Sequence, residues 1–439
     1  MDAALSREAL RNTFVEGFKD PQNLQIGVEW EKIGVYVDTG KAIRYSGPDG
    51  VEAIFKELSA RFGWRPILSD SHIIALAKDG SSITLEPGGQ IELSGRKAPR
   101  LKENFDELYE HLKEIREVSS EMGIAWLGTG VQPVSPVDEI EWVPKRRYDI
   151  MREALKNNGA LTTSMMKQTA SIQISVDVTD EADAVEKLRL AMGLAPLLSA
   201  LFANSPISEG RLNGFFSRRA HIWTRTAPER TGILEKVFTK PDFGIDDYVE
   251  YALTVPMFFI IRGDKWIPMN GMTFRDFHKN GFREFRAAQA DWELHLTTIF
   301  TEARLKKYLE IRSIDCQRTE LGLAAPALIK GIFYDASSRK KAWELVADLS
   351  LEERRRLAEE APAEGLKTKF KGKTLMEPVL ELLKLGEGGL PEDEKGYLKP
   401  LKDLVTGRGM VPAQILMNCF DRDLSEKGAV QRLIECASI

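Results

Sequence analysis

Glutamate residues recur in short segments in which polar and apolar residues alternate. Residues 28–32 read Val-Glu-Trp-Glu-Lys. Alternate residues of a β-strand point to the same face of its sheet, so Glu29 and Glu31 are expected to share a face. By the same spacing, Glu310 and Arg312 share a face in a later segment. These segments predict strands that carry carboxylates on one side.

Two further segments add oxygen-bearing side chains to this set. Glu86 and Glu92 flank the turn Pro-Gly-Gly, and glycine lets two chain segments approach closely because it has no side chain. Gln173 lies in residues 171–175, where polar residues occupy one side and isoleucines the other. If all four segments belong to one sheet, these side chains meet in one hollow.

The chemistry of such a hollow follows from its charge. Carboxylates that share a site raise each other's pKa unless a cation neutralises them. Hard oxygen ligands suit Mg²⁺ or Mn²⁺ rather than zinc. Metal ions of this kind bridge phosphate oxygens during transfer from ATP, and the guanidinium of Arg312 would hold the transferred phosphoryl group. The residue types therefore indicate a site for metal-bound ATP.

Other interpretations of the same residues stay open. Alternating polar and apolar residues are also typical of strands with one face in water. Two carboxylates could act as general acid and base on a glycosidic bond, but five glutamates and an arginine fit metal and phosphate better. Residues 371–374 resemble the end of a P-loop, yet Gly365 stands seven residues before Gly372, where that loop needs five. We interpret this segment as a solvated basic loop, so ATP would be bound by another fold.

The elements that must position these residues form a mixed pattern. Helices are predicted over residues 1–20, 50–62, 100–122, 147–155 and 182–203, and strands over 26–37, 124–134, 170–178 and 308–314, with strands and turns between 64 and 93. From about residue 322 the pattern is mainly helical, except that glycines and acids over 386–396 indicate an exposed loop. The mixture predicts an α+β fold with an antiparallel-rich sheet and a helical C-terminal part.

The composition indicates an ordinary soluble protein. The chain has 439 residues, of which 43% are hydrophobic and 29% charged, and its net charge is −5. This predicts no nucleic-acid partner. The apolar stretches 190–203 and 251–261 are shorter than the roughly 20 residues of a membrane span, so no membrane partner is expected either. The charged start shows no secretory signal. The spacing of Cys316, Cys419 and Cys436 predicts neither a disulfide framework nor a zinc site, and hence a reducing cytoplasm.

Several blocks of the sequence resemble the plant-type glutamate–cysteine ligases. They are residues 27–32, 85–95, 147–152, 201–206, 221–224, 230–232, 295–300 and 308–312, in the order in which the family has them. The resemblance implies a fold like the catalytic domain of glutamine synthetase, with a curved, mainly antiparallel sheet forming a funnel. The length and the pattern of elements predict a single catalytic unit over 1–439, with the active-site core over about 20–335 and the helical part over about 336–439.

The resemblance also implies a reaction. ATP would phosphorylate the γ-carboxylate of glutamate, and the amino group of cysteine would then displace phosphate to give γ-glutamylcysteine, the first step of glutathione-type thiol synthesis. By this similarity Arg312 is the catalytic residue. The implied metal ligands are Glu29, Glu31, Glu86, Glu92, Gln173 and Glu310. A ligase of the same fold that uses another amine, a regulatory protein that keeps the fold, and a kinase or phosphatase with an acidic metal site are alternatives. Both a monomer and a homodimer are compatible with the sequence.

Three arginines are candidates for binding the α-carboxylate of glutamate. Arginine suits this role because its planar fork matches the geometry of a carboxylate. Arg147, Arg152 and Arg230 all lie in blocks that resemble the family. Each could equally be a surface charge or part of a structural ion pair.

The pocket for cysteine is expected before the strand that carries Gln173. Met165, Met166 and Thr169 could line it, because a thiol favours small apolar and polarisable neighbours, although methionines also pack in cores. His221 and Trp223 could shape the same wall. A lone histidine is more often structural than catalytic.

Overall fold

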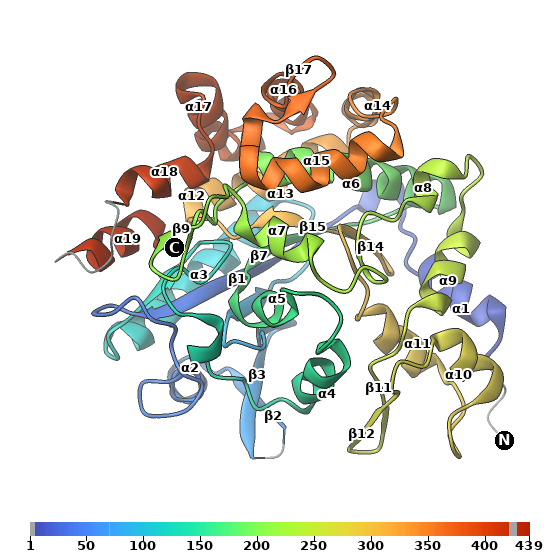
Figure 1. Ribbon diagram of the computed structural model, residues 1–439, viewed down its shortest axis with the longest axis horizontal. Helices are drawn as coiled ribbons and strands as arrows, with labels where there is room; N and C mark the ends of the chain where they lie inside the picture. The colour runs from blue at the N-terminus through green and yellow to red at the C-terminus, as the bar shows by residue number, and fades with distance from the viewer. Residues whose placement is uncertain (1–4, 70, 421–427) are drawn as a thin grey trace.

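The computed structural model of the protein describes residues 5–69, 71–420 and 428–439. Its centre is a nine-stranded sheet whose neighbouring strands pair in antiparallel fashion (Figure 1). The strand order is β14 (Ala303–Leu305), β15 (Leu309–Asp315), β7 (Ser171–Val176), β1 (Ile26–Tyr36), β5 (Ile91–Ser94), β4 (Ser81–Leu85), β3 (His72–Lys78) and β2 (Arg65–Ser69), and β6 (Ile124–Leu127) pairs with the second half of β1. The sheet is open, because β14 and β2 are its two edges.

The long strand β1 has two different faces. Trp30 points to the side covered by helix α3 (Leu101–Ser120), where its ring lies 6.3 Å from the ring of Phe105. Glu29 and Glu31 point to the other side, as the strand period requires. The acids therefore lie on the sheet face opposite the aromatic core.

Helices cover the sheet and form a rim in front of it. Helix α2 (Val51–Phe62) packs against α3 and β3, α6 (Glu181–Leu201) against β14 and β15, and α13 (Ala324–Phe333) against β7 and β1. The rim consists of α4 (Arg146–Leu155), α5 (Thr162–Gln168) and α7 (Arg218–Thr224). Beside the β14 edge lie α1 (Arg7–Val15), α9 (Ile245–Thr254), α10 (Phe274–Asn280), α11 (Gln289–Leu296) and the hairpin of β11 (Phe259–Arg262) and β12 (Lys265–Pro268) (Figure 1).

The C-terminal part is helical, as the sequence predicts. It contains α14 (Ala336–Glu344), α15 (Leu351–Glu364), α16 (Met376–Gly389), α17 (Lys399–Arg408), α18 (Pro412–Cys419) and α19 (Ala429–Ala437). The prediction of an exposed loop over 386–396 was wrong, because α16 continues to Gly389 and Glu392–Tyr397 form a 3-10 helix. Gly386 and Gly389 touch Gly331 of α13 so closely that a Cβ on Gly331 or Gly389 would overlap the other helix's backbone. These glycines let two helices approach each other instead of forming a turn.

The prediction from the cysteine spacing needs a correction. Cys419 and Cys436, 17 residues apart, form a disulfide that joins α18 to α19. Cys316 is free and buried. Sequence spacing missed the disulfide because the two cysteines meet through the packing of α18 against α19, which spacing alone does not show. The backbone N–H of Ile439 donates to the carbonyl of Trp126 at 3.0 Å, so the end of the chain is also attached to β6.

The expected fold class is confirmed by these elements. The predicted helices over 100–122 and 182–203 correspond to α3 and α6, and the predicted strand over 170–178 corresponds to β7. Residues 371–374 belong to a small hairpin of β16 (Lys369–Phe370) and β17 (Lys373–Thr374) rather than to a P-loop. Within the described ranges, no helix combines the length and the hydropathy that crossing a bilayer requires.

Candidate active site

The strand register places oxygen-bearing side chains opposite one another. Glu31 of β1 pairs with Glu92 of β5, and Glu29 pairs with Gln173 of β7. Glu310 lies on β15, the next strand beyond β7. Like charges directly opposite each other destabilise an antiparallel pair. The Glu31–Glu92 pair therefore indicates a function rather than a contribution to stability.

These strands form the floor of a cavity of about 280 Å³. Its wall combines acids, cations and aromatic or sulfur-containing side chains. They include Glu29, Glu31, Glu86, Glu92, Gln173, Lys145, Arg147, Arg219, Arg304, Arg312, Tyr148, Trp223, Phe300, Met151, Met165, Met166 and Thr169. Glu310 is fully buried behind this wall. The structure thus brings together the six residues predicted as metal ligands and Arg312.

The carboxyl groups on β1 have unusual proton affinities. Burial raises the pKa of Glu29 to about 8, and the carboxylates of Glu92 and Glu310 contribute in the same direction. Burial likewise raises the pKa of Glu31 to about 8, together with Glu86 and Glu92. Both groups would ionise far more readily beside a cation, which is what a metal-binding site provides.

Two of the acids are oriented by hydrogen bonds. The carboxylate of Glu31 accepts from the backbone N–H of Ser171 at 2.6 Å and from Nε2 of Gln173 at 2.9 Å. The carboxylate of Glu92 accepts from the hydroxyl of Thr84 at 3.0 Å. Each bond comes from the strand next to the one that carries the acid: β7 for Glu31 on β1, and β4 for Glu92 on β5. The sheet itself therefore fixes the direction of both carboxylates.

Glu310 has different surroundings from the other acids. Its carboxylate lies 2.6 Å from the guanidinium of Arg304, 2.9 Å from that of Arg312 and 3.0 Å from the ammonium of Lys306. These three cations hold the pKa of Glu310 well below its usual value despite complete burial. Glu310 is therefore charged, whereas burial favours the protonated forms of Glu29 and Glu31.

A break in the strand pairing directs Arg312 into the cavity. The register between β15 and β7 shifts between Ile311 and Ile314. Such irregularities re-aim side chains and are frequent beside active sites. The backbone N–H of Arg312 donates to the carbonyl of Glu302 at 3.1 Å, and its guanidinium donates to Oε1 of Gln173. Arg312 consequently bridges two strands at the acid cluster.

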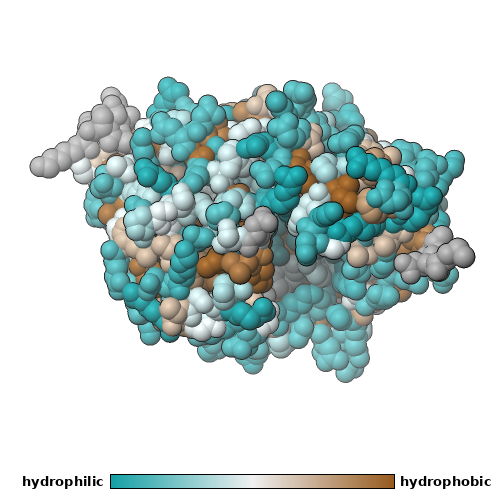
Figure 2. All heavy atoms as spheres, turned by 90° about the horizontal axis from the view of Figure 1, so that it is seen from below, coloured by the Kyte–Doolittle hydropathy of each residue, from teal (hydrophilic) through white to brown (hydrophobic). Residues whose placement is uncertain are grey.

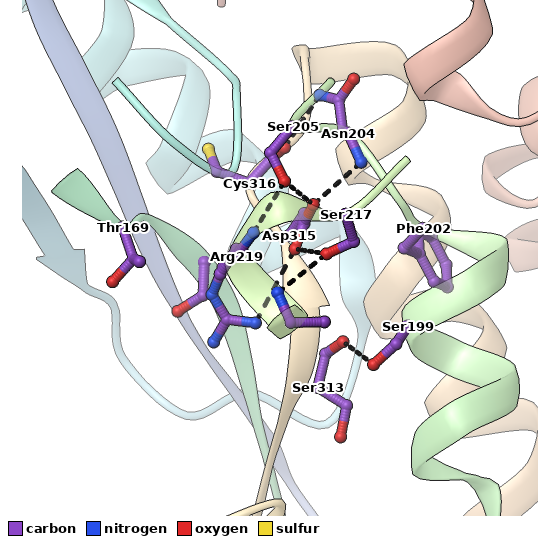
Figure 3. A network of polar contacts seen from close by, with 12 residues as sticks. Thr169, Ser199, Phe202, Asn204, Ser205, Ser217, Arg219, Ser313, Asp315 and Cys316 are labelled. Atoms are coloured by element: carbon purple, nitrogen blue, oxygen red, sulfur yellow. Dashed lines mark hydrogen bonds and ion pairs between the residues drawn. The ribbon is translucent and has the colours of Figure 1, made fainter. Parts of the chain in front are cut away.

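A buried carboxylate at the end of β15 organises the adjoining wall (Figure 3). Asp315 accepts from the backbone N–H of Asn204 at 2.9 Å, the hydroxyl of Ser205 at 2.7 Å and the hydroxyl of Ser217 at 2.9 Å. The guanidinium of Arg219 lies 3.8 Å from the same carboxylate. This network fixes the start of α7 against β15 and thereby positions Arg219 at the cavity.

Arg219 was missed by the sequence analysis. It lies one helical turn before Trp223, and its guanidinium is 5.9 Å from the centroid of that indole. Both side chains line the cavity. His221, which the sequence analysis named, stacks on Phe215 with a centroid distance of 4.3 Å and is not part of the cavity wall. The four-residue spacing from Trp223 is the signal that would have selected Arg219.

Helix α4 separates the cavity from a larger groove of about 1100 Å³. Arg147 and Met151 line the cavity, while Asp149 and Arg152 line the groove. Seen from below, the molecule is hollowed near its middle (Figure 2). The helix therefore divides the two arginines that the sequence predicted for glutamate.

Arg230 also lines the groove rather than the cavity. Its side chain is almost entirely buried. The guanidinium donates to the carbonyls of Thr298, at 3.0 Å, and of Pro256. Because these bonds use its fork to join two loops, the environment of Arg230 is that of a structural residue.

The residues predicted for cysteine lie together at one end of the cavity. Met165, Met166 and Thr169 all line it. The glycine-rich turn approaches them closely, because a Cβ on Gly88 would overlap the carbonyl of Lys167. This agrees with the expectation that the turn lets two segments meet.

The acids offer suitable donors for a hard cation, but they do not form a finished metal site. Within the part of the chain that the structure describes, no three acidic, histidine or cysteine side chains are grouped closely enough to hold a metal ion. Both oxygens of Glu310 are paired with cations, Oε2 with Arg304 and Arg312 and Oε1 with Lys306. The oxygen set therefore fits Mg²⁺ or Mn²⁺ if side chains turn toward a common centre.

An open antiparallel sheet with carboxylates on one face and arginines around them is the arrangement of an ATP-dependent carboxylate–amine ligase. The chain belongs to glutamate–cysteine ligase family 2, whose sequence model matches residues 25–436.

Relatives and solved structures agree with this assignment. The chain is 39% identical over 427 residues to glutamate–cysteine ligase B, chloroplastic, of Oryza sativa subsp. japonica, covering 96% of this chain and 85% of the relative. It is 40% identical over 423 residues to the chloroplastic glutamate–cysteine ligase of Arabidopsis thaliana, covering 95% and 80%. The crystal structure of glutamate–cysteine ligase from Francisella tularensis in complex with AMP superposes with a TM-score of 0.56 at 13% identity, covering 96% and 88%, and so shares the fold.

Proposed function

We propose that the protein joins the γ-carboxylate of glutamate to the amino group of cysteine at the expense of ATP. The reaction would proceed in two steps. A γ-carboxylate oxygen attacks the terminal phosphorus, ADP leaves, and the cysteine nitrogen then displaces phosphate from the γ-glutamyl phosphate. The observation that carries this proposal is the convergence of the strand acids and Arg312 in one cavity of a chain that belongs to this family.

The acid side of the cavity would hold the metal ions. The ligands are Glu29, Glu31, Glu86, Glu92, Gln173 and Glu310, and Mg²⁺ or Mn²⁺ would supply positive charge to the phosphate oxygens. Arg312 lies beside Glu310 and Gln173, where its guanidinium would stabilise the negative charge on the transferred phosphoryl group. The raised pKa values of Glu29 and Glu31 support this assignment, because a cation lowers the cost of ionising them.

The opposite side of the cavity would bind the amino acids. Arg147 and Arg219 both line it, and Nε of Arg147 is buried without a hydrogen-bond acceptor. We assign the α-carboxylate of glutamate to these two guanidinium groups. The cysteine side chain would lie against Met165 and Met166, and Trp223 would close the wall.

A ligase that uses a different amine is the alternative, because a few pocket side chains decide the acceptor. ADP release should be measured with glutamate, Mg²⁺ and a panel of amino acids, with mass-spectrometric identification of the product. We expect fast release with cysteine, slow release with alanine, and none without glutamate or metal. Equal rates with cysteine and alanine would refute the cysteine assignment, and release without glutamate would indicate a kinase or phosphatase.

The cytoplasmic location and the choice between monomer and homodimer remain predictions from the sequence. The similar plant enzymes are named chloroplastic. Light scattering of the purified protein would determine the oligomeric state.

A further inference from the structure

Three cations surround the single carboxylate of Glu310. Arg304, Lys306 and Arg312 all lie within 3.0 Å of its oxygens. One carboxylate and three cations leave two positive charges in excess immediately around Glu310, beside a cavity floor that carries four further acids, Glu29, Glu31, Glu86 and Glu92. Such an excess is expected where a more strongly charged anion binds.

The three cations differ in how firmly they are held. Arg304 also donates to the carbonyls of Thr297 at 2.8 Å and Ile299 at 2.9 Å, so its guanidinium is fixed. Arg312 is bound to Gln173. Within the described residues, the ammonium of Lys306 makes no second hydrogen bond that would fix it in this way. It lies 4.8 Å from the centroid of the Tyr308 ring, and its charge also acts on Glu29 and on Lys97.

Lys306 is also in a position that permits movement. It lies in the turn between β14 and β15, and β14 is an edge strand of the sheet. Its side chain retains 19% of its exposure, whereas that of Glu310 retains none. The lysine stem is flexible, and its ammonium acts as a point charge rather than as a rigid fork. Lys306 can therefore change its partner without disturbing the sheet.

The carboxylate of Glu310 cannot bind a metal ion while the ammonium of Lys306 occupies the same oxygen. The ammonium is 3.0 Å from Oε1, whereas the guanidinium groups of Arg304 and Arg312 pair with Oε2. A divalent ion on Oε1 would meet two like-charged side chains, Lys306 and Arg304, at short range. The repulsion is relieved if the cations find another anion, and the phosphate chain of ATP carries about four negative charges.

We propose that Lys306 is a nucleotide-binding residue which exchanges its partner: it pairs with Glu310 when the site holds no nucleotide, and with phosphate oxygens once metal-bound ATP arrives. Arg304 supports the same phosphates from its fixed position. This inference rests on the proposed metal role of Glu310. It makes Glu310 available to the metal only in the presence of nucleotide, so that metal and ATP bind cooperatively.

The test uses Lys306→Met, which removes the charge and keeps most of the side-chain length, on the full chain. Lys307→Met is the matched control, because Lys307 is adjacent and pairs only at the surface, 3.5 Å from Glu16 and 3.8 Å from Glu293. Two quantities are measured: Mn²⁺ binding without nucleotide, by electron paramagnetic resonance, and binding of a non-hydrolysable ATP analogue with Mg²⁺, by calorimetry. Lys306→Arg tests whether charge alone restores nucleotide binding.

The exchange predicts opposite changes in the two affinities. In Lys306→Met, affinity for the ATP analogue should fall about 10- to 100-fold, and affinity for Mn²⁺ alone should rise about tenfold because Glu310 loses a competing cation. Lys307→Met should match the wild type, and Lys306→Arg should recover most of the nucleotide affinity. Unchanged nucleotide affinity, or a fall in both affinities, would overturn the exchange. If the wild type bound no Mn²⁺ with or without the analogue, the proposed metal site itself would fail and this inference with it.

Discussion

The two hollows on either side of helix α4 differ in size and in chemistry. The groove beside Asp149 and Arg152 is about four times larger than the cavity beside Arg147. Most of its charged side chains lie along one surface of α4, where Arg152 pairs with Asp149 at 3.9 Å, and Glu229 and Arg230 add to them from a loop. The cavity is smaller, but its charges come from several strands and point at one another. Convergence of side chains from separate strands, rather than volume, marks the site of chemistry.

The largest effect is expected from an acid on the cavity side. Glu31→Gln should lower the rate of ADP release by about a thousandfold or more, because it removes a charged metal ligand next to the transferred phosphoryl group. Glu153→Gln, on the groove side of α4, is the control and should leave the rate within about twofold. Comparable losses in both variants would show that the groove belongs to the active site.

A smaller but still large effect is expected at Arg312. Arg312→Ala should reduce kcat by about a hundred- to a thousandfold, while KM for glutamate changes little, since the contact strengthens as charge develops on the phosphoryl group. Steady-state kinetics with varied glutamate separate the two constants. An unchanged kcat would remove Arg312 from the mechanism.

Substituting two arginines of α4 in turn compares the two hollows directly, because Arg147 lines the cavity and Arg152 lines the groove. Arg147→Ala should raise KM for glutamate about 10- to 100-fold through loss of a charge-assisted contact. Arg152→Ala should change it by less than about twofold, because this exposed side chain pairs only weakly with Asp149. The reverse result would place glutamate in the groove.

The smallest effect concerns stability. The pKa values of Glu29 and Glu31, raised to about 8 in the folded protein, exceed the ordinary value of 4.5. The folded chain therefore binds protons that the unfolded chain releases. With metal removed by EDTA, the free energy of unfolding should fall as pH rises from about 4.5 to 8.

Glu31→Gln removes one of these titrating groups. It should reduce the slope of the unfolding free energy against pH by at most about 1.4 kcal/mol per pH unit. Urea unfolding at several pH values measures it, and identical slopes in both proteins would contradict the assigned pKa.

Much of the cavity floor was predictable because it depends on the two-residue period of strands. That period, applied to Glu29, Glu31 and Glu310, identifies the correct face without any knowledge of strand order. The rim was less predictable. Arg219 and His221 are two residues apart on α7, and only the helical spacing from Trp223 distinguishes the one that faces the cavity.

Other residues owe their surroundings to contacts that the sequence analysis did not anticipate. Arg230 looks like a substrate ligand by type and motif, but the loops that offer it Thr298 and Pro256 are remote in sequence. Lys306 and Arg304 were not singled out either, although they lie four and six residues before Glu310 and Arg304 is its partner across the β14–β15 hairpin, so the local spacing did hold a signal. Local periodicity defines faces, whereas partners across the fold depend on tertiary packing.

The three glycines shared by α13 and α16 have a consequence for engineering. Gly331 touches Gly386 and Gly389 backbone to backbone, and α13 in turn rests on β7 and β1, which carry Gln173 and Glu29. A methyl group added at Gly331 would either push α13 toward those strands or separate α16 from α13. A substitution in α16, which lies more than fifty residues after Arg312 in the sequence, could thus misalign side chains in the cavity.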